Sequence, residues 1–459
     1  MVGTDAGVSM RIVIIGAGNV GFTSAEALSK VNDVLIVEKD AMRAENTKAL
    51  LSVSVLHEDG SNPKVLEAAI KRIDADIIIS AVPDDSHNLF ICMMAKRIKP
   101  SIKTVACLRD PDYIIKTSKE GAEGVNLMIS PELITAEKIE KLAVLENAIE
   151  YDHISSMDID LATFRIEEGH SLVGKIVLDI DIPADCNIIA VYRGDSVILG
   201  NETAEIHAGD RIRVLGSPES IVAFNKLIGV EKEAKEFVIL GASIVGVETA
   251  KRLIQGNKRR IVKIIDDDIV LSRNAARELV DVTVVNGDFI DPSVLRSENV
   301  RRADVVITVS SMDERNLLGC MAGLKFGIRK IISKYSNQEY KEIFGYTGIE
   351  SIIGYHRVIF NEITKNLLFD ENAVLAVEND NEFFFRAAID ERSALRGNRL
   401  GDISVPERIR VAAIRRGDAT IYPRMDTMFE EGDKVLLFTH KVNPIELSRL
   451  LGHNAPLEL

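Results

Sequence analysis

Two stretches of this sequence share one pattern of strand, glycine turn and helix, and this duplication restricts the fold more than any other feature. The first is RIVIIGAGNVG, residues 11–21, and the second is FVILGASIVG, residues 237–246. In each, an apolar run typical of a buried strand leads into closely spaced glycines and then into a helix-forming segment. Such a segment begins a parallel-sheet unit, so we expect two of these units in the chain.

The similarity extends well beyond the glycines. The segment VSVLHEDGSNPKVLEAA is matched by VTVVNGDFIDPSVLRSE, which pairs Asp59 with Asp288. Further on, DADIIISAVPDDSHNLF is matched by RADVVITVSSMDERNLL, which pairs Asn88 with Asn316. A chance similarity at one turn would not persist in this order, so the two halves are a true internal repeat.

A second kind of repeat follows each parallel-sheet unit. Short alternating strands surround the hairpin turns Gly194-Asp195 and Gly417-Asp418, which require positive backbone angles. The expected fold class is α/β, with two Rossmann-like doubly wound parallel-sheet domains, each followed by a small β-rich α+β domain. The predicted boundaries are 10–140, 141–232, 233–370 and 371–459.

In the first parallel-sheet unit, each glycine of GAGNVG has its own role. Gly16 permits the tight turn, Gly18 lets a pyrophosphate approach the backbone, and Gly21 lets the helix pack closely on the strand. The backbone N–H groups of Asn19 and Val20 would donate to phosphate at the positive end of the helix. The turn therefore predicts nucleotide binding.

Glu38, about 20 residues further along at the end of VLIVE, fits the acid that accepts hydrogen bonds from the ribose hydroxyls. Its charge would repel the extra phosphate of NADP, so NAD or an adenine nucleotide is favoured. Arg109, in TVACLRDPDY, has two interpretations that spacing leaves open. Its guanidinium group either reaches the phosphates or forms a surface ion pair with Asp110 or Asp112.

The second turn departs from this pattern because Ser243 replaces the middle glycine of GASIVG. Its side chain would stand in the path of the pyrophosphate, and since serine is small, binding is expected to be weakened and not abolished. Asp266 supplies the acid after a longer connection, QGNKRR, while Ser336 takes the position of Arg109 with Lys334 nearby. We expect the first half to bind nucleotide more tightly.

Charge and cysteine usage exclude several classes of protein. A net charge of −14 opposes binding to nucleic acid. The four cysteines form no C-x-x-C pair, so neither a zinc site nor a disulfide framework is expected. No apolar run approaches the roughly 18 residues of a membrane span. The first nine residues, MVGTDAGVS, are interpreted as a tag remnant or an alternative start.

We find no catalytic or metal-binding constellation in the sequence. His87 lies closest to the presumed site, but its counterpart in the second half is Arg315, and His57 is replaced by Asn286. Because the β-rich units share only turns and alternating apolar residues, they are interpreted as binding or assembly modules. A nucleotide would then be sensed, and would shift one conformation against another.

Two helices are candidates for assembly between copies of the chain. The segments NLFICMMAKRI and NLLGCMAGLKFGI begin at Asn88 and Asn316 and are apolar over much of their surface. Packing on the parallel sheet of the same unit would explain that pattern equally well.

Taken in order, these motifs resemble the TrkA family of regulatory subunits of Trk potassium uptake systems, which have two tandem RCK (KTN) halves. The resemblance covers residues 10–459 and rests on GAGNVG, VEKD, HEDGSNPKVL, DDSHN, LRDPDY, LVGK and YRGD, followed by the second set. It implies that the β-rich units are RCK C-terminal domains.

The resemblance also implies ligands and partners. The ligand would be NAD or NADH, with ATP and ADP as further candidates. The partner would be a membrane potassium-translocating subunit of the TrkH or TrkG kind, contacted by a homo-oligomeric ring that is cytoplasmic and peripheral to the inner face of the cell membrane. The candidate nucleotide-binding residues are Gly16, Ala17, Gly18, Asn19, Val20, Gly21, Glu38, Asp59, Val82, Pro83 and Arg109, and Gly241, Ala242, Ser243, Ile244, Val245, Gly246, Asp266, Ser310 and Ser311.

Two other functions remain open from the sequence. One is an NAD-dependent oxidoreductase whose active site is not recognised, and the other is a free-standing nucleotide sensor with a different partner. Turnover of NADH with a small acceptor would identify the first. A neighbouring gene for a multi-span membrane protein would argue against the second.

Overall fold

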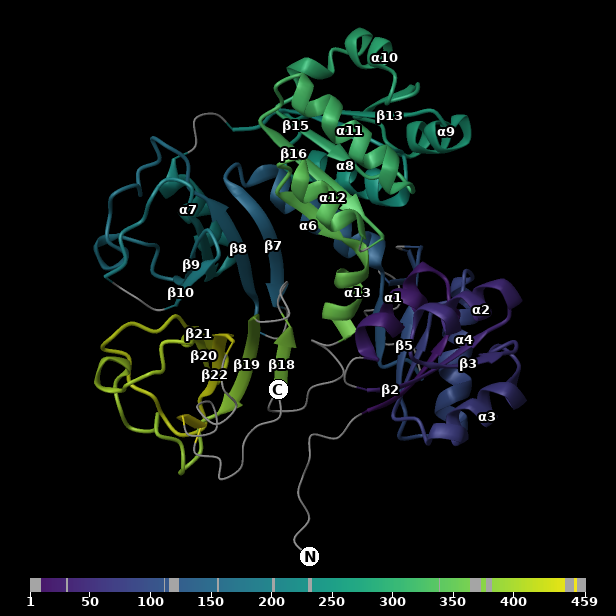
Figure 1. Cartoon of the computed structure of the whole chain (residues 1–459), viewed down its shortest axis with the longest axis horizontal. Coiled ribbons are helices and arrows are strands. Elements are labelled where there is room, and N and C mark those ends of the chain that lie inside the picture. Colours follow the sequence, from purple (N-terminus) through teal and green to yellow (C-terminus); the bar gives the residue numbers. More distant parts are fainter. Residues whose placement is uncertain are drawn as a thin grey trace, which may run out of the picture. The chain divides into compact units, whose positions relative to one another are not determined.

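We analysed a computed structural model of the chain (Figure 1). The structure describes residues 10–29, 32–110, 112–114, 124–154, 157–199, 203–229, 233–337, 339–363, 373–376, 382–441 and 450–451. The segment MVGTDAGVS and the expected boundaries near 232 and 370 lie outside these residues. The chain divides into two compact units, one of residues 1–135 and 354–368 and one of residues 136–353 and 369–459.

The first unit is built on a six-stranded parallel sheet in the order β3-β2-β1-β4-β5-β6. Its strands are β1 (Arg11–Ile15), β2 (Asp33–Glu38), β3 (Ser54–His57), β4 (Ile77–Ser80), β5 (Lys103–Cys107) and β6 (Leu127–Ile129). Apolar runs such as IVII and VLIV are buried on both faces, as expected of a parallel sheet between helices. The strand order reverses between β1 and β4, and in open α/β sheets ligands bind outside the carboxyl ends of the strands at such a point.

Side-chain caps start three helices of this unit. Asp40, Asn62 and Asp84 accept backbone N–H groups at the starts of α2 (Ala41–Leu50), α3 (Pro63–Ile73) and α4 (Asp85–Ile98). The helix that follows the glycine turn is α1 (Asn19–Leu28), and α6 (Pro131–Val144) starts after β6.

One helix of the first unit comes from the second half of the sequence. α13 (Tyr355–Ile363) lies beside α1 (Figure 1). Its Ile359 and Ile363 are buried in the same apolar cluster as Ile12 and Ile14 of β1. The core of the first unit is therefore completed by residues more than 300 positions away from its glycine turn.

The second unit contains a parallel sheet with the same order, β14-β13-β12-β15-β16-β17. Its strands are β12 (Glu236–Leu240), β13 (Ile261–Asp266), β14 (Thr283–Asn286), β15 (Val305–Thr308), β16 (Lys330–Tyr335) and β17 (Ser351–Gly354). Its helices are α8 (Ile244–Gly256), α9 (Ile269–Glu278), α10 (Pro292–Ser297), α11 (Asp313–Lys325) and α12 (Glu339–Tyr346).

The second unit also holds two five-stranded antiparallel sheets. The first β subdomain has the order β10-β9-β11-β8-β7, formed by β7 (Ala148–Ile154), β8 (Ile159–Arg165), β9 (Cys186–Arg193), β10 (Ser196–Leu199) and β11 (Arg211–Gly216), with α7 (Pro218–Ile228) after it. The second β subdomain has the order β18-β19-β22-β20-β21, formed by β18 (Ala373–Ala376), β19 (Glu382–Ala388), β20 (Ile409–Arg416), β21 (Ala419–Ile421) and β22 (Lys434–His440).

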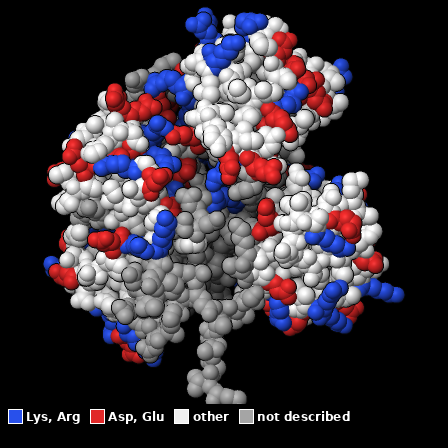
Figure 2. Space-filling model, in the orientation of Figure 1, with Lys and Arg blue, Asp and Glu red and all other residues white. Residues whose placement is uncertain are grey.

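The expected hairpin turns and the expected fold class are confirmed. Gly194 and Gly417 have φ of 55° and 57°, and each joins two paired antiparallel strands. Both predicted parallel sheets are present, and the β-rich parts are antiparallel. None of the helices in the described residues has the length and apolar character needed to cross a membrane. On the face drawn in Figure 2, basic side chains are intermingled with acidic ones.

Candidate functional site

The geometry of the first turn requires glycine at two of its three positions. Gly16 has φ of 96°, and a Cβ there would lie 2.9 Å from the carbonyl oxygen of Ala81. A Cβ on Gly21 would lie 1.8 Å from the carbonyl oxygen of Gly16, which no side chain tolerates. The backbone of the turn therefore requires glycine at these two positions.

Gly18 is different because the protein does not need a glycine there. Its φ of −69° and ψ of −175° suit any residue. No heavy atom of the described residues lies within 4 Å of the position its Cβ would take. The space beside Gly18 is open, and within the described residues no side chain caps the N-terminus of α1. Amides at a helix start next to open space are suited to an anionic phosphate.

Glu38 is held against this turn at the end of β2. Its Oε2 accepts the backbone N–H of Ala17 at 2.5 Å, and its Oε1 accepts that of Asp40 at 2.7 Å. The side chain is buried, with 4% exposure. Since each carboxylate oxygen can accept a second hydrogen bond, both retain capacity for a ribose hydroxyl.

The loop after β4 lies next to the first glycine turn, and Asn88 of α4 holds this loop in place. The Asn88 side chain accepts the N–H of Val82 at 2.8 Å and donates to the carbonyl oxygens of Val82 at 2.9 Å and Cys107 at 2.7 Å. Ala81 and Val82 lie beside Gly16, because they are the residues a Gly16 Cβ would meet, and Pro83 follows them on this loop.

Arg109 follows β5 and is exposed. Its backbone N–H donates to Asp85 at 3.0 Å, and that of Asp110 donates to the same carboxylate at 2.8 Å. Sequence reasoning missed the positioning roles of Asp85 and Asn88. The signal was present, since both residues recur in the second half as Asp313 and Asn316.

Asp59 lies on the loop after β3, at the same carboxyl edge of the sheet. Its Oδ1 accepts the backbone N–H and the hydroxyl group of Ser61, at 2.9 and 2.7 Å. These bonds lower the pKa of the Asp59 carboxyl group. The carboxylate is thus ionised and engaged by its own loop.

The second turn repeats the skeleton of the first. Gly241 has φ of 118°, and a Cβ on Gly246 would lie 2.2 Å from the Gly241 carbonyl oxygen. Asp266 accepts the N–H of Ala242 at 2.6 Å and that of Asp268 at 2.8 Å. The described structure thus gives Asp266 the position that Glu38 has in the first half.

The loop after β15 is also repeated. Asn316 accepts the N–H of Ser310 at 2.8 Å, as Asn88 does for Val82. Asp313 accepts the N–H groups of Ser336 and Asn337, at 2.9 and 2.8 Å, so Ser336 occupies the place of Arg109. Ser311, the next residue after Ser310 on this loop, is exposed.

Ser243 fills the position that is open at Gly18. Its hydroxyl group donates to the carbonyl oxygen of Val309 at 2.6 Å and accepts the N–H of Gly246 at 3.3 Å, which caps α8. Of the two residues that follow, Ile244 is partly exposed and Val245 is buried. The start of α8 therefore has an internal hydrogen-bond partner that the start of α1 lacks.

A second internal group lies at the carboxyl edge of this sheet. The guanidinium group of Arg315 bridges Asp267 and Asp288, at 2.9 Å from each, and lies over the ring of Phe289 at 4.6 Å. In the first half the equivalent His87 is exposed and lies 3.1 Å from Asp84. Arg315 thus cross-links the edge of the second site, where the first remains open.

Within the part of the chain that the structure describes, we find no group of side chains arranged for catalysis or for metal binding. Among the described residues, no three His, Cys, Asp or Glu side chains are grouped to hold a metal ion. His57 lies 3.2 Å from the carbonyl oxygen of Lys39 and His87 projects outward, and neither contacts a nucleophile among the described side chains.

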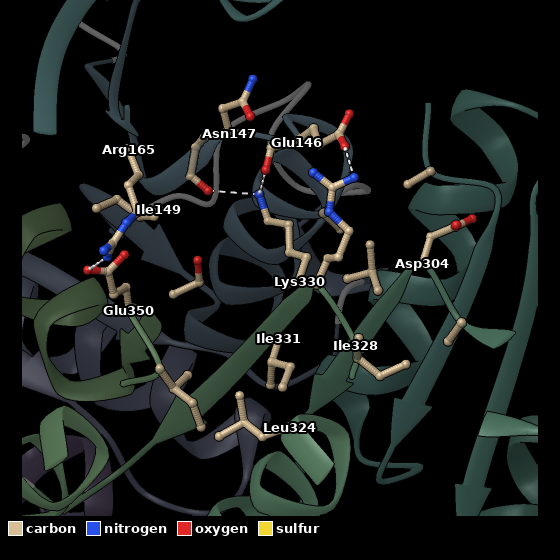
Figure 3. Close-up of a pocket in the computed structure, with 18 of the residues that line it drawn as sticks. Glu146, Asn147, Ile149, Arg165, Asp304, Leu324, Ile328, Lys330, Ile331 and Glu350 are labelled. Atoms are coloured by element: carbon tan, nitrogen blue, oxygen red, sulfur yellow. Dashed lines mark hydrogen bonds and ion pairs between the residues drawn. The ribbon is translucent and has the colours of Figure 1, made fainter. Parts of the chain in front are cut away.

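A cavity of about 410 Å³ lies at the other end of the second parallel sheet (Figure 3). Its lining includes Val305, Lys330 and Ser351, which are the first residues of β15, β16 and β17. The Nζ of Lys330 donates to the carbonyl oxygens of Leu145, Glu146 and Ala148 at 2.5, 3.2 and 2.7 Å. Burial lowers the pKa of Lys330 to about 7.

Charged side chains of opposite sign lie together in this cavity. Arg165 pairs with Glu350 (Figure 3), and Arg329 lies 3.7 Å from Glu146. The second glycine turn lies at the carboxyl ends of the strands and the cavity at their amino ends, so the cavity is separate from that turn. It lies where the segment after α6 contacts the sheet.

Comparison with known proteins agrees with this architecture. The TrkA-N domain profile matches residues 12–131 and 237–355, and the TrkA-C domain profile matches residues 161–229 and 384–452. The Trk system potassium uptake protein TrkA homolog 1 of Methanosarcina mazei is 31% identical over 94% of this chain and 97% of its own. The Trk system potassium uptake protein TrkA of Haemophilus influenzae is 26% identical over 97% of this chain and 99% of its own.

Solved structures share the fold at lower identity. The RCK domain of GsuK superposes with a TM-score of 0.64 at 18% identity, covering 94% of this chain and 93% of that one. The GsuK channel bound to NAD gives a TM-score of 0.63 at 18% identity, covering 94% and 77%. The predicted resemblance is confirmed: this chain belongs to the TrkA family, and it carries the TrkA-N and TrkA-C domains twice.

Proposed function

We propose that the first glycine turn binds NAD or NADH, and that the chain is a regulatory subunit of a potassium uptake system. The observation that carries the nucleotide site is the uncapped start of α1 beside the open space at Gly18. The proposed contacts in the first half are Gly16, Ala17, Gly18, Asn19, Val20, Gly21, Glu38, Asp59, Val82, Pro83 and Arg109.

Glu38 supports the choice of dinucleotide. Its buried carboxylate lies where the adenosine ribose would approach the end of β2, and two backbone N–H groups fix its orientation. A second phosphate on that ribose would meet this negative charge at close range. NAD and NADH should therefore bind well, while NADP should bind poorly.

The second glycine turn is a weaker site in this proposal. Its contacts would come from Gly241, Ala242, Ser243, Ile244, Val245, Gly246, Asp266, Ser310 and Ser311. A ligand there must displace the Ser243 cap and fit beside the Arg315 bridge. Both interactions favour the empty turn, so ATP or ADP, like NAD, should bind this half less tightly than the first.

The regulatory role rests on the family and on the kind of site. Relatives over nearly the full chain are named Trk system potassium uptake proteins. The nucleotide would be sensed and not turned over, because no described side chain stands ready for proton or hydride chemistry. The partner would be a membrane potassium-translocating subunit of the TrkH or TrkG kind, contacted from the cytoplasm at the inner face of the membrane.

Exposed apolar side chains support assembly into a homo-oligomeric ring. Phe90 and Met93 lie two and five residues after Asn88 on α4, with 44% and 49% exposure. Leu318 and Met321 stand at the same places after Asn316 on α11, with 48% and 50% exposure. Each pair lies three residues apart and therefore shares one helix face.

Calorimetric titration of the full chain against NAD, NADH, NADP, ATP and ADP tests the nucleotide site. We expect one tight site per chain for NAD or NADH and an affinity for NADP at least about tenfold lower, equivalent to about 1.4 kcal/mol. Equal affinity for NADP would contradict the role of Glu38. Failure of every nucleotide to bind would contradict the site itself.

Potassium flux in vesicles that hold the membrane subunit tests the regulatory role. Adding the purified chain with the bound nucleotide should change the flux, and Gly18→Ser should reduce that nucleotide effect. Oxidation of NADH with a small acceptor would instead support an oxidoreductase.

A further inference from the structure

The two β subdomains share one apolar core, and an approximate twofold axis relates them at their contact. Asn187 of β9 and Arg410 of β20 are equivalent positions of the repeat, 223 residues apart, and they contact each other at 3.3 Å. The strand registers support the equivalence. Tyr192 pairs with Arg211 as Arg415 pairs with Lys434, and both ladders shift at the same place. Two equivalent positions that touch each other lie at a twofold axis.

This twofold relation is broken by one buried ion pair. Arg213 of β11 and Glu382 of β19 lie 2.7 Å apart across the contact, with side chains 4% and 0% exposed. The register shows that the equivalent of Arg213 is Leu436, since Arg213 pairs with Ala190 as Leu436 pairs with Ala413.

The equivalent of Glu382 is also apolar. Asp160 pairs with Gly216 as Phe383 pairs with Thr439, so Ile159 corresponds to Glu382. Ile159 and Leu436 are both fully buried in the shared core. One side of the axis is therefore ionic and the other is apolar.

Several contacts hold the ionic side in the native pairing, although the Oε1 of Glu382 makes no hydrogen bond among the described residues and lies 3.5 Å from the Nδ1 of His440. The guanidinium group of Arg213 also contacts Glu150 at 2.7 Å and Thr163 at 3.1 Å. The hydroxyl group of Tyr192 donates to the Oε2 of Glu382 at 3.1 Å. Since a buried charge is tolerated only when it is paired and hydrogen-bonded, this network is acceptable only when both members of the pair are present.

We propose that the Arg213–Glu382 pair makes the first β subdomain pair with a second β subdomain and excludes pairing between identical subdomains. Two first subdomains placed in the same contact would bury Arg213 against Ile159 twice. Two second subdomains would bury Glu382 against Leu436 twice, and would bring two Arg410 guanidinium groups together at the axis. Two second subdomains would thus leave the fully buried Glu382 without its cation twice, and two first subdomains would leave Arg213 without Glu382, beside Glu150 of its own subdomain. The mixed pairing gives Glu382 its cation and is therefore favoured over both identical pairings.

The pair is therefore a specificity determinant for this contact. If several chains assemble, identical β subdomains of different chains compete with the partner from the same chain. An ionic side that exists only in the mixed pairing prevents that exchange, and so keeps the first and second halves in fixed alternation.

The test exchanges the residues at the two equivalent positions 159 and 382, by combining Ile159→Glu with Glu382→Ile in the full chain. This variant has the composition of the natural protein. Its first subdomain holds both Arg213 and an acid, so two first subdomains can form the ion pair twice, while two second subdomains meet through apolar side chains only. The mixed pairing would place the introduced carboxylate against Leu436 without a cation and would leave Arg213 with Glu150 of its own subdomain.

Cross-linking between position 187 of one chain and position 187 of another reports pairing between two first β subdomains. All chains carry Asn187→Cys, and Cys186→Ser removes the neighbouring thiol. A short bifunctional thiol reagent joins position 187 of two chains only when two first subdomains meet. We expect at least about tenfold more of this interchain product in the exchanged variant than in the natural pairing. A chain with both Asn187→Cys and Arg410→Cys should give an intrachain product and serves as the positive control.

An exchanged variant that folds and still shows no interchain product would overturn the proposal. If that variant does not fold, thermal unfolding of Arg213→Leu, Glu382→Ile and the double variant decides. Each single change should lower the melting temperature, and the double change should recover most of the loss. Additive losses in the double variant would equally overturn the proposal. Removal of the exposed pair Arg396–Glu431, by Arg396→Ala with Glu431→Ala, should change neither readout.

Discussion

At the scale of the single residue, Gly18 and Gly21 share one turn but meet opposite requirements. Gly18→Ser should leave the melting temperature nearly unchanged, because its Cβ would enter open space. The same change should weaken NAD binding by about 1 to 2 kcal/mol, roughly a five- to thirty-fold change, since the hydroxymethyl group occupies the path of the phosphate. Calorimetry with thermal unfolding separates the two effects.

Two further variants frame this prediction. Gly21→Ala should lower the melting temperature severely, because its Cβ would lie 1.8 Å from a backbone oxygen. Ser243→Gly should strengthen binding in the second half by removing the cap from α8. If Gly18→Ser binds NAD as tightly as the natural chain, phosphate does not pass at this position.

The carboxyl group of Glu132, at the start of α6, should make the stability of the first unit depend on pH. Burial raises the pKa of its carboxyl group. A hydrogen bond from the Tyr355 hydroxyl group at 2.7 Å and the charge of Arg109 both lower this pKa, but by less than burial raises it. Within the described residues its Oε2 has no hydrogen-bond partner. Because the folded state binds this proton more tightly than the unfolded state, the first unit is stabilised as the pH falls through the raised pKa.

Glu132→Gln should therefore melt about 2–4 °C higher than the natural chain near neutral pH. The difference should disappear at acid pH, where both side chains are neutral. Melting curves between about pH 4 and 8 measure this convergence. A constant difference across that range would show that the charge of Glu132 is not responsible.

At the scale of the element, α13 shows what the sequence pattern alone does not reveal. The repeat and the periodicity predict a helix that buries one face, but an apolar face does not specify which sheet it covers. Some features could be predicted because each depends on the geometry of a few neighbouring residues. These are the glycine turns, the acids Glu38 and Asp266, and the Gly194 hairpin. The packing of α13 on α1 depends on the tertiary fold.

This packing predicts that a change in the second half destabilises the first unit. Ile359 is fully buried in the core that contains Ile12 and Ile14. Ile359→Ala should therefore lower the unfolding free energy of the first unit by about 2–4 kcal/mol. Added NAD should raise the melting temperature of this same transition. Ile343→Ala on α12, where the side chain is 41% exposed, is the matched control and should change little. Equal effects of the two changes would argue against a structural role of α13 in the first unit.

At the scale of the whole molecule, the two halves have one skeleton, and their glycine turns differ in their internal contacts. The sequence predicted weaker nucleotide binding in the second half from Ser243, because the missing glycine is visible in the motif, and this difference in affinity stays a prediction. It did not predict that the hydroxyl group caps α8 and reaches Val309, or that Arg315 bridges Asp267 and Asp288. Those partners are separated along the chain and meet only once the sheet has formed. The duplicated fold therefore leaves one turn open and closes the other internally.

The last prediction concerns association of the whole chain through α4 and α11. Phe90 and Met93 present an apolar face on α4, and Leu318 and Met321 present the equivalent face on α11. If copies associate through these faces, Met93→Glu with Met321→Glu buries charge at each contact and should reduce the mass of the assembly. Val280→Glu adds the same charge at a separate apolar residue with 92% exposure and should leave the mass unchanged. Sedimentation velocity at micromolar concentration, with and without NAD, measures the mass. An unchanged mass in the double variant would place the contact elsewhere, and a monomeric natural chain would contradict the ring.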